Sequence, residues 1–159
     1  MKADVQKEHL WLQKLIGDWT FEAECMPGPD QPPTKTRSSN TARSLGGLWT
    51  LVEGEGESPD GTVVKSIITL GYDPAEHRFV GSFIASCMTH LWTYGGKLDE
   101  TGNVLTLDTE GPNFSGDGSM SKYQDLIEIA DDNHWILRSR ALGEDGKWVQ
   151  FMEGHYRRV

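Results

Sequence analysis

An acidic side chain in a strand-like segment is the residue that offers the clearest chemistry. Asp125 alternates with polar neighbours, and Tyr123 and Ile127 share its parity, whereas Gln124 and Glu128 have the opposite one. Successive side chains of a strand point to opposite faces, so Asp125 is expected to point inward. Burial raises the pKa of a carboxylic acid, and such a group can serve as a general base.

Motifs that define a reaction are missing from the sequence. It contains no Gly-x-Ser-x-Gly, no His-Glu-x-x-His, no Cys-x-x-Cys and no phosphate-binding glycine loop. The five histidines show no metal-ligand spacing. Cys25 and Cys87 are predicted to be reduced thiols, buried as small apolar side chains. We therefore expect no metal site and favour a binding protein over an enzyme, although an enzyme built around Asp125 stays open.

Strands must position these residues, and a short helix precedes them. Leu12, Leu15 and Ile16 recur at helical spacing, which predicts a helix over 3–16 with Asp4 as N-cap and Gly17 as its stop. From Trp19 the apolar residues alternate with polar ones, as in a strand with one dry face. Ten strands are predicted, beginning at Trp19–Cys25 and continuing with Lys35–Leu45, Leu48–Glu55, Thr62–Tyr72, Arg78–Ser86, Leu91–Leu98, Val104–Glu110, Tyr123–Ile129, Trp135–Leu142 and Trp148–Arg157.

The connections between these strands carry turn residues such as Ser58-Pro59-Asp60-Gly61 and Gly143-Glu144-Asp145-Gly146, and a weaker turn is expected near Cys87–Thr89. No connection is long enough for a parallel crossover, so the sheet should be antiparallel. Closing the sheet removes its edges, which favours an all-β, up-and-down barrel of about ten strands with a short N-terminal helix. A two-sheet sandwich is the alternative.

The residues expected inside this barrel combine aromatic walls with polar groups. A solid core would not select Asn40, Asp125 or Gln150, since each buried polar group needs a partner. A cavity for a small, largely apolar ligand supplies such partners. The alternative is that these groups satisfy one another or face solvent at the barrel mouth. The predicted cavity-lining residues are Trp19, Phe21, Asn40, Tyr123, Asp125, Trp135, Gln150 and Tyr156.

Composition limits the classes of partner. The 159 residues fit one domain, 1–159, with the barrel over 17–158, and the net charge is −9. An acidic chain argues against binding to nucleic acid or to anionic lipid. No apolar run reaches the ~20 residues that span a bilayer, and the charged N-terminus lacks the apolar stretch of a signal peptide. We expect a cytoplasmic protein with a small-molecule partner; the oligomeric state is left open.

Several short blocks resemble an uncharacterised bacterial domain-of-unknown-function family of the calycin superfamily, which includes lipocalins, fatty-acid-binding proteins and nitrobindins. The blocks are Gly17-Asp18-Trp19, Met26-Pro27-Gly28, Leu45-Gly46-Gly47, Leu70-Gly71-Tyr72-Asp73 and Met152-Glu153-Gly154-His155-Tyr156-Arg157. The resemblance covers nearly the whole chain. It implies a calycin-like barrel that encloses a small apolar ligand.

Two branches of that superfamily imply more specific sites. The nitrobindins imply a haem-binding sensor or isomerase, for which His155 is the positional candidate as axial ligand. Its parity neighbours Glu153 and Arg157 are expected to point outward, which favours a surface histidine and a protein without a cofactor. The fatty-acid-binding proteins imply an Arg-x-Tyr clamp on the last strand. Here Gly154 stands two residues before Tyr156, and Arg138 and Arg140 are expected on the solvated face.

Overall fold

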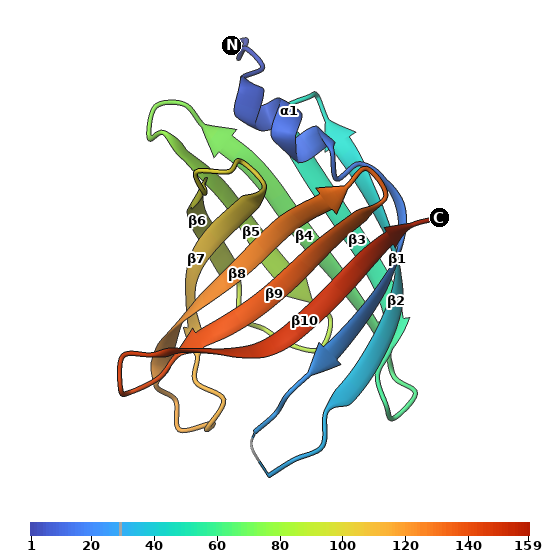
Figure 1. The fold of residues 1–159 in the computed structure, drawn as a ribbon, viewed down its shortest axis with the longest axis vertical. Coiled ribbons are helices and arrows are strands. Elements are labelled where there is room, and N and C mark those ends of the chain that lie inside the picture. The colour runs from blue at the N-terminus through green and yellow to red at the C-terminus, as the bar shows by residue number, and fades with distance from the viewer. Residues whose placement is uncertain (29) are drawn as a thin grey trace.

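The computed structural model describes residues 1–28 and 30–159. Its elements follow one another in the order of the chain (Figure 1). They are α1 (Lys7–Gln13), β1 (Gly17–Cys25), β2 (Thr34–Leu45), β3 (Trp49–Glu57), β4 (Val63–Asp73), β5 (Arg78–Ala85), β6 (Trp92–Leu98), β7 (Val104–Pro112), β8 (Met120–Asp131), β9 (His134–Leu142) and β10 (Trp148–Arg158).

The ten strands form a closed antiparallel barrel, as the turn pattern predicted. Each strand pairs with its neighbours in sequence, and β1 closes the barrel against β10, where Phe21 lies opposite Tyr156. Closure gives every strand two partners and leaves no edge exposed. The sandwich alternative is therefore wrong. The weaker turn expected near Cys87–Thr89 is present as the link between β5 and β6.

The helix is shorter than the predicted range of 3–16. It begins at Lys7, and its N-cap is Gln6 rather than the predicted Asp4; His9 completes a capping box with Gln6. The donated hydrogen bond runs from the Gln6 backbone N–H to His9 Nδ1 at 2.8 Å. Gly17 does not stop the helix; it opens β1 with φ of 140°. Among the described residues, no helix has the length and apolar character required to cross a membrane.

Helix α1 lies across one end of the barrel (Figure 1). Leu12 and Leu15 are completely buried there, and Trp11 Nε1–H donates to the Gly102 carbonyl of the β6–β7 turn at 2.7 Å. These side chains join the core that fills this half of the barrel, which includes Trp19, Val52, Leu70, Leu105, Ile127 and Trp135. The α1 end is thus filled by apolar side chains and sealed by the helix.

Strand β10 contains the one error in the predicted parity of the binding residues. The pairing with β9 shifts between Gln150 and Met152, because Phe151 is an extra residue in the strand. A bulge of one residue reverses the faces of the residues before it. Gln150, predicted to line the cavity, therefore lies exposed on the outer face beside Arg140. Trp148 likewise lies on the outer face, under the Arg140 guanidinium.

The prediction for the two cysteines needs a correction. Cys87 is exposed in the β5–β6 link, and Cys25 is half-buried at the end of β1. Both thiols are free. Cys87 was expected to be buried because cysteine usually is, but it falls in a turn that lies outside the ladder of strands.

Candidate binding site in the barrel interior

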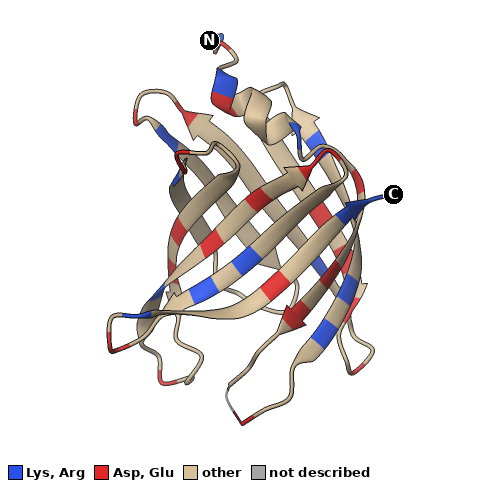
Figure 2. Ribbon diagram, in the orientation of Figure 1, with Lys and Arg blue, Asp and Glu red and all other residues tan. Residues whose placement is uncertain are grey.

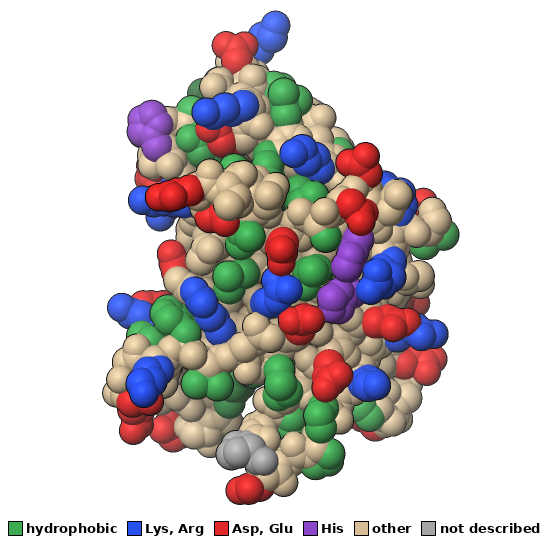
Figure 3. All heavy atoms as spheres, viewed as in Figure 1, with side chains coloured by type: hydrophobic (Ala, Val, Ile, Leu, Met, Phe, Trp, Pro, Cys, Tyr) green, Lys and Arg blue, Asp and Glu red, His purple; other side chains and the backbone are tan. Residues whose placement is uncertain are grey.

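The barrel interior is not filled along its whole length. In the half away from α1, inward-facing side chains retain accessible surface, although the wall around them is closed. These side chains lie towards the open end of the barrel, where the interior is packed less tightly than beneath α1. We call this space the inner recess; its half-buried lining residues are Phe21, Thr36, Ser38, Ser66, Phe83, Asp125 and Met152. The surface is notched at this end of the molecule (Figure 3).

Asp125 of β8 lies at the inner end of the recess. Its Oδ2 accepts a hydrogen bond from the Tyr94 hydroxyl, and its Oδ1 accepts one from the Ser139 hydroxyl, each at 2.5 Å. Burial raises the pKa of the Asp125 carboxyl, and the two donated hydrogen bonds oppose that rise. The group is deep within the protein and still partly accessible. A ligand in the recess can therefore reach it.

An aromatic stack forms one wall. The Tyr156 ring lies parallel to the Trp135 ring with centroids 3.5 Å apart, and Phe21 covers Tyr156 at 4.3 Å. A Cβ at position 154 would overlap the Phe21 ring, so Gly154 is what allows that ring to lie flat against the wall. This wall resembles the flat apolar surfaces on which ligand sites are usually built.

The hydroxyl of Tyr156 faces the recess without a partner. Tyr156 is 3% exposed, and no other described residue forms a hydrogen bond with its Oη, which is also not among the fully enclosed unpaired atoms. Burial, followed by the charge of Asp125, raises the pKa of this phenol. The indole N–H of Trp135 behind it is fully enclosed and has no acceptor within the described part of the chain. This wall therefore contains one accessible hydroxyl and one enclosed indole N–H without protein partners.

Asn40 forms the opposite polar edge. Its Nδ2–H donates to Ser38 Oγ at 2.8 Å, while its Oδ1 lies over Gly54, in the space that a Cβ would need. Ser66 Oγ borders the same space. Strands β2 and β4 thus present an amide oxygen and two hydroxyls to the recess, on either side of Gly54 in β3.

The structure separates the eight predicted residues into groups. Phe21, Asn40, Asp125 and Tyr156 come together at the recess. Trp19 and Trp135 lie behind them, edge to face at 6.2 Å in the filled half. Tyr123 lies towards the open end, where its hydroxyl donates to the Pro112 carbonyl at 2.7 Å. Gln150 is outside the barrel.

Sequence reasoning did not include Tyr94 and Ser139 among the site residues. Ser139 shares the parity of Trp135 in its strand, but nothing in the sequence links it to Asp125. Tyr94 lies in a strand rich in glycine and aromatic residues (Trp92–Leu98), where no alternation of charged residues indicates the inner face. Its reach across β7 to Asp125 is a property of the tertiary structure.

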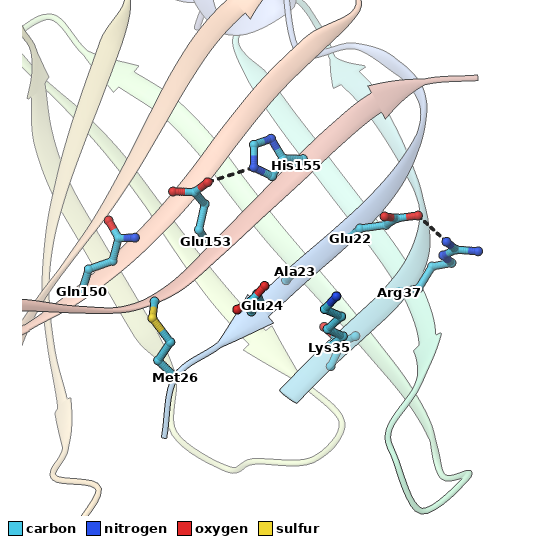
Figure 4. A pocket seen from close by; sticks show the side chains of 10 residues that line it. Glu22, Ala23, Glu24, Met26, Lys35, Arg37, Gln150, Glu153 and His155 are labelled. Carbon is cyan, nitrogen blue, oxygen red and sulfur yellow. Dashed lines mark hydrogen bonds and ion pairs between the residues drawn. The ribbon is translucent and has the colours of Figure 1, made fainter. Parts of the chain in front are cut away.

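A second concavity lies on the outer face of β10, β1 and β2 (Figure 4). This groove of about 530 Å³ is lined mainly by charged side chains, including Glu22, Glu24, Lys35, Arg37 and Glu153. Arg37 pairs with Glu22, and Arg138 pairs with Glu153 at 3.0 Å. Five of its ten lining residues carry a charge and it is open to solvent, so it is a poorer site for an apolar ligand than the recess.

His155 lies on that outer face, and both of its ring nitrogens are engaged. Nδ1 is 2.8 Å from His134 Nε2, and Nε2 is 2.9 Å from Glu153 Oε1. The network is satisfied when His155 Nε2–H donates to Glu153 and His134 donates to Nδ1. The two rings stack with centroids 5.1 Å apart.

This position does not fit a haem ligand. An axial histidine needs a free nitrogen directed at an apolar pocket, whereas His155 is tied to charged neighbours on the outer wall. Across the described ranges, no cluster of three or more His, Cys, Asp or Glu side chains has the geometry to hold a metal ion. Arg138 and Arg140 also lie on the outer face, bonded to Glu128 and Gln124. Charged positions of both signs are spread along the strands (Figure 2).

The comparison with protein families is decisive for the affiliation of the chain. Residues 4–158 match the model of a family described as "Protein of unknown function (DUF1579)". The chain belongs to this family. None of the curated proteins compared with this DUF1579 member matches it.

Solved structures similar to this DUF1579 chain share its barrel at low sequence identity. Rv2717c from M. tuberculosis has a TM-score of 0.67 and 13% identity, over 98% of this chain and 99% of that one. The S-type phycobiliprotein lyase CPES from Guillardia theta has a TM-score of 0.64 and 13% sequence identity, over 99% of this chain and 98% of the lyase. The redesigned β-barrel mFAP0, bound to DFHBI, has a TM-score of 0.51 and 12% sequence identity, over 92% of this chain and 100% of that barrel. At these identities the likeness shows the fold alone.

Proposed function

We propose that this DUF1579 protein binds a small, largely apolar molecule in the inner recess. The observation that carries the proposal is the combination of accessible inward side chains with unpartnered polar atoms, Asn40 Oδ1 and Tyr156 Oη, in a closed barrel. Neither atom is among the fully enclosed unpaired ones, so water or a ligand in the recess can reach and satisfy both. Aromatic walls with a few polar anchors are the usual composition of a ligand site.

The fold is compatible with this role, since the redesigned barrel mFAP0 was solved with DFHBI bound. Membership of the calycin superfamily and a cytoplasmic location are further parts of the proposal. They are supported by the barrel with its N-terminal helix and by two thiols that are not paired with each other.

A matched pair of substitutions tests the location of the site. Ser38 is half-buried and faces the recess, whereas its neighbour Ser39 is exposed on the outer face. The neutral fluorophore N-phenylnaphthylamine, which brightens in apolar surroundings, should bind the wild type saturably. Ser38→Phe fills part of the recess and should weaken that binding by about tenfold, whereas Ser39→Phe should leave it within about twofold.

Fluorescence titration gives both affinities, and native mass spectrometry of the purified protein shows whether a molecule is carried along. Circular dichroism confirms that each variant is folded. Equal effects of the two substitutions, or no saturable binding by the wild type, would show that the recess is not a ligand site.

A further inference from the structure

Asp125 is the only charged side chain that the described structure brings to the recess. The ion pairs of the described residues join outward-facing side chains, and none includes Asp125. Its hydrogen-bonding neighbours are the neutral hydroxyls of Tyr94 and Ser139. The phenol of Tyr156 is the other titratable group that faces it. The recess therefore carries a negative charge without a protein counter-charge.

The hydrogen bonds around Asp125 favour the ionised form of its carboxyl group. Both carboxyl oxygens are hydrogen-bonded to hydroxyl groups, and donation from these hydroxyls stabilises the ionised carboxylate against the effect of burial. Each oxygen keeps a further lone pair for a donor that approaches from the recess. Asn40 Oδ1, across the recess, is a second acceptor.

The walls beside these acceptors are aromatic. Phe21 and Tyr156 lie one over the other next to Asp125. The faces of such rings attract cations, and more strongly in desolvated surroundings. An anion would meet an uncompensated carboxylate in a poorly solvated space, where repulsion between like charges is large.

We propose that the ligand of the inner recess is an apolar or aromatic molecule that carries a protonated amino group, which binds to Asp125 and is covered by the aromatic wall. This inference rests on the proposed binding function and specifies the class of its ligand. It also separates this protein from barrels that bind fatty acids through a cationic clamp, because here the anchoring charge is negative.

Three molecules of one size test the charge preference. Naphthylmethylamine, naphthylmethanol and naphthoate, in the same positional isomer, share the aromatic body and differ in the charge of the attached group. Isothermal titration calorimetry with the wild type should rank the amine tightest, with an affinity at least about tenfold above that of the alcohol, and the acid weakest.

Two variants assign the preference to Asp125. Asp125→Asn keeps the shape but removes the charge, so the amine and the alcohol should then bind within about twofold of each other. Asp108→Asn is the control, because Asp108 is exposed on the adjacent strand β7 and accepts from Gln124 on the outer face. It should retain the wild-type ranking. Should Asp125→Asn fail to fold, the wild-type ranking of the three molecules decides by itself.

The outcomes separate the two proposals. If the wild type binds naphthoate as well as or better than the amine, the inference about ligand class is wrong while the binding function stands. An amine preference that persists in Asp125→Asn has the same consequence. If the wild type binds none of the three molecules and no N-phenylnaphthylamine, both proposals fail.

Discussion

Two threonines of the barrel interior differ in a single hydrogen bond. Thr109 of β7 is buried, and its hydroxyl has no partner among the described residues. Thr50 of β3 is 1% exposed, and its hydroxyl donates to the Leu12 carbonyl at 3.4 Å. The same isosteric substitution should therefore have opposite effects at the two positions.

Thr109→Val should stabilise the protein by about 0.5–1 kcal/mol, since it removes a buried polar atom that gains nothing in return. Thr50→Val should destabilise it by about 1 kcal/mol because it leaves the Leu12 carbonyl unsatisfied. Urea denaturation, with the midpoint compared at constant slope, measures both changes. A lower midpoint for Thr109→Val would mean that its hydroxyl has a partner in solution.

Individual side chains were also where prediction from the sequence was strongest for the site. Asp125, Asn40 and Tyr156 were expected to point inward from the alternation of charged neighbours, and the structure places all three inside. The reason is physical: a strand has a period of two, so one exposed charge indicates the orientation of every neighbour. That reasoning stopped at Tyr94, whose strand has no such alternation.

At the scale of elements, strands β8, β9 and β10 are tied together on their outer face by charges. Arg138 on β9 bonds Glu128 on β8 at 2.6 Å and Glu153 on β10 at 3.0 Å. The hydrogen bond from His155, followed by that from Arg138, holds the pKa of Glu153 below its ordinary value of 4.5. A carboxyl with a lowered pKa stabilises the fold above its unfolded pKa, and this contribution is lost as the pH falls through the folded value.

Glu153→Gln should therefore reduce stability at neutral pH, and this loss should shrink as the pH falls below 4.5 and through the lower pKa of the folded state. Because Glu153 is 36% exposed, we expect a loss of less than about 1 kcal/mol. Urea midpoints at several pH values measure it. Glu100→Gln, in an exposed turn, is the control and should show no such dependence; a constant difference for Glu153→Gln at all pH values would contradict the assignment.

At the scale of the whole molecule, the two ends of the barrel differ in how their interior is packed. The end covered by α1 is filled with apolar side chains, whereas the recess opens at the opposite end. Stability and binding should consequently respond to different substitutions. In α1 itself, Leu12 is 1% exposed and Leu10 is 56% exposed, which offers a comparison within one helix.

Leu12→Ala should cost about 2–4 kcal/mol of stability because it leaves a cavity under the helix. Leu10→Ala should change stability by less than about 0.5 kcal/mol. Neither should alter the affinity for N-phenylnaphthylamine at temperatures where the protein is folded. Thermal denaturation and fluorescence titration measure the two properties, and a large loss of affinity in Leu12→Ala would show that the ends are coupled.

The sequence by itself determined the ten strands, their antiparallel order and the inner face of most of them, because alternation and turn residues are local signals. Only the tertiary structure decided the bulge at Phe151, which moved Gln150 to the outer face. It also decided the contact of Tyr94 and Ser139 with Asp125, which joins three different strands. A bulge depends on how two strands pair, and a site inside a barrel depends on how far side chains reach across it, so neither is encoded in the spacing of nearby residues.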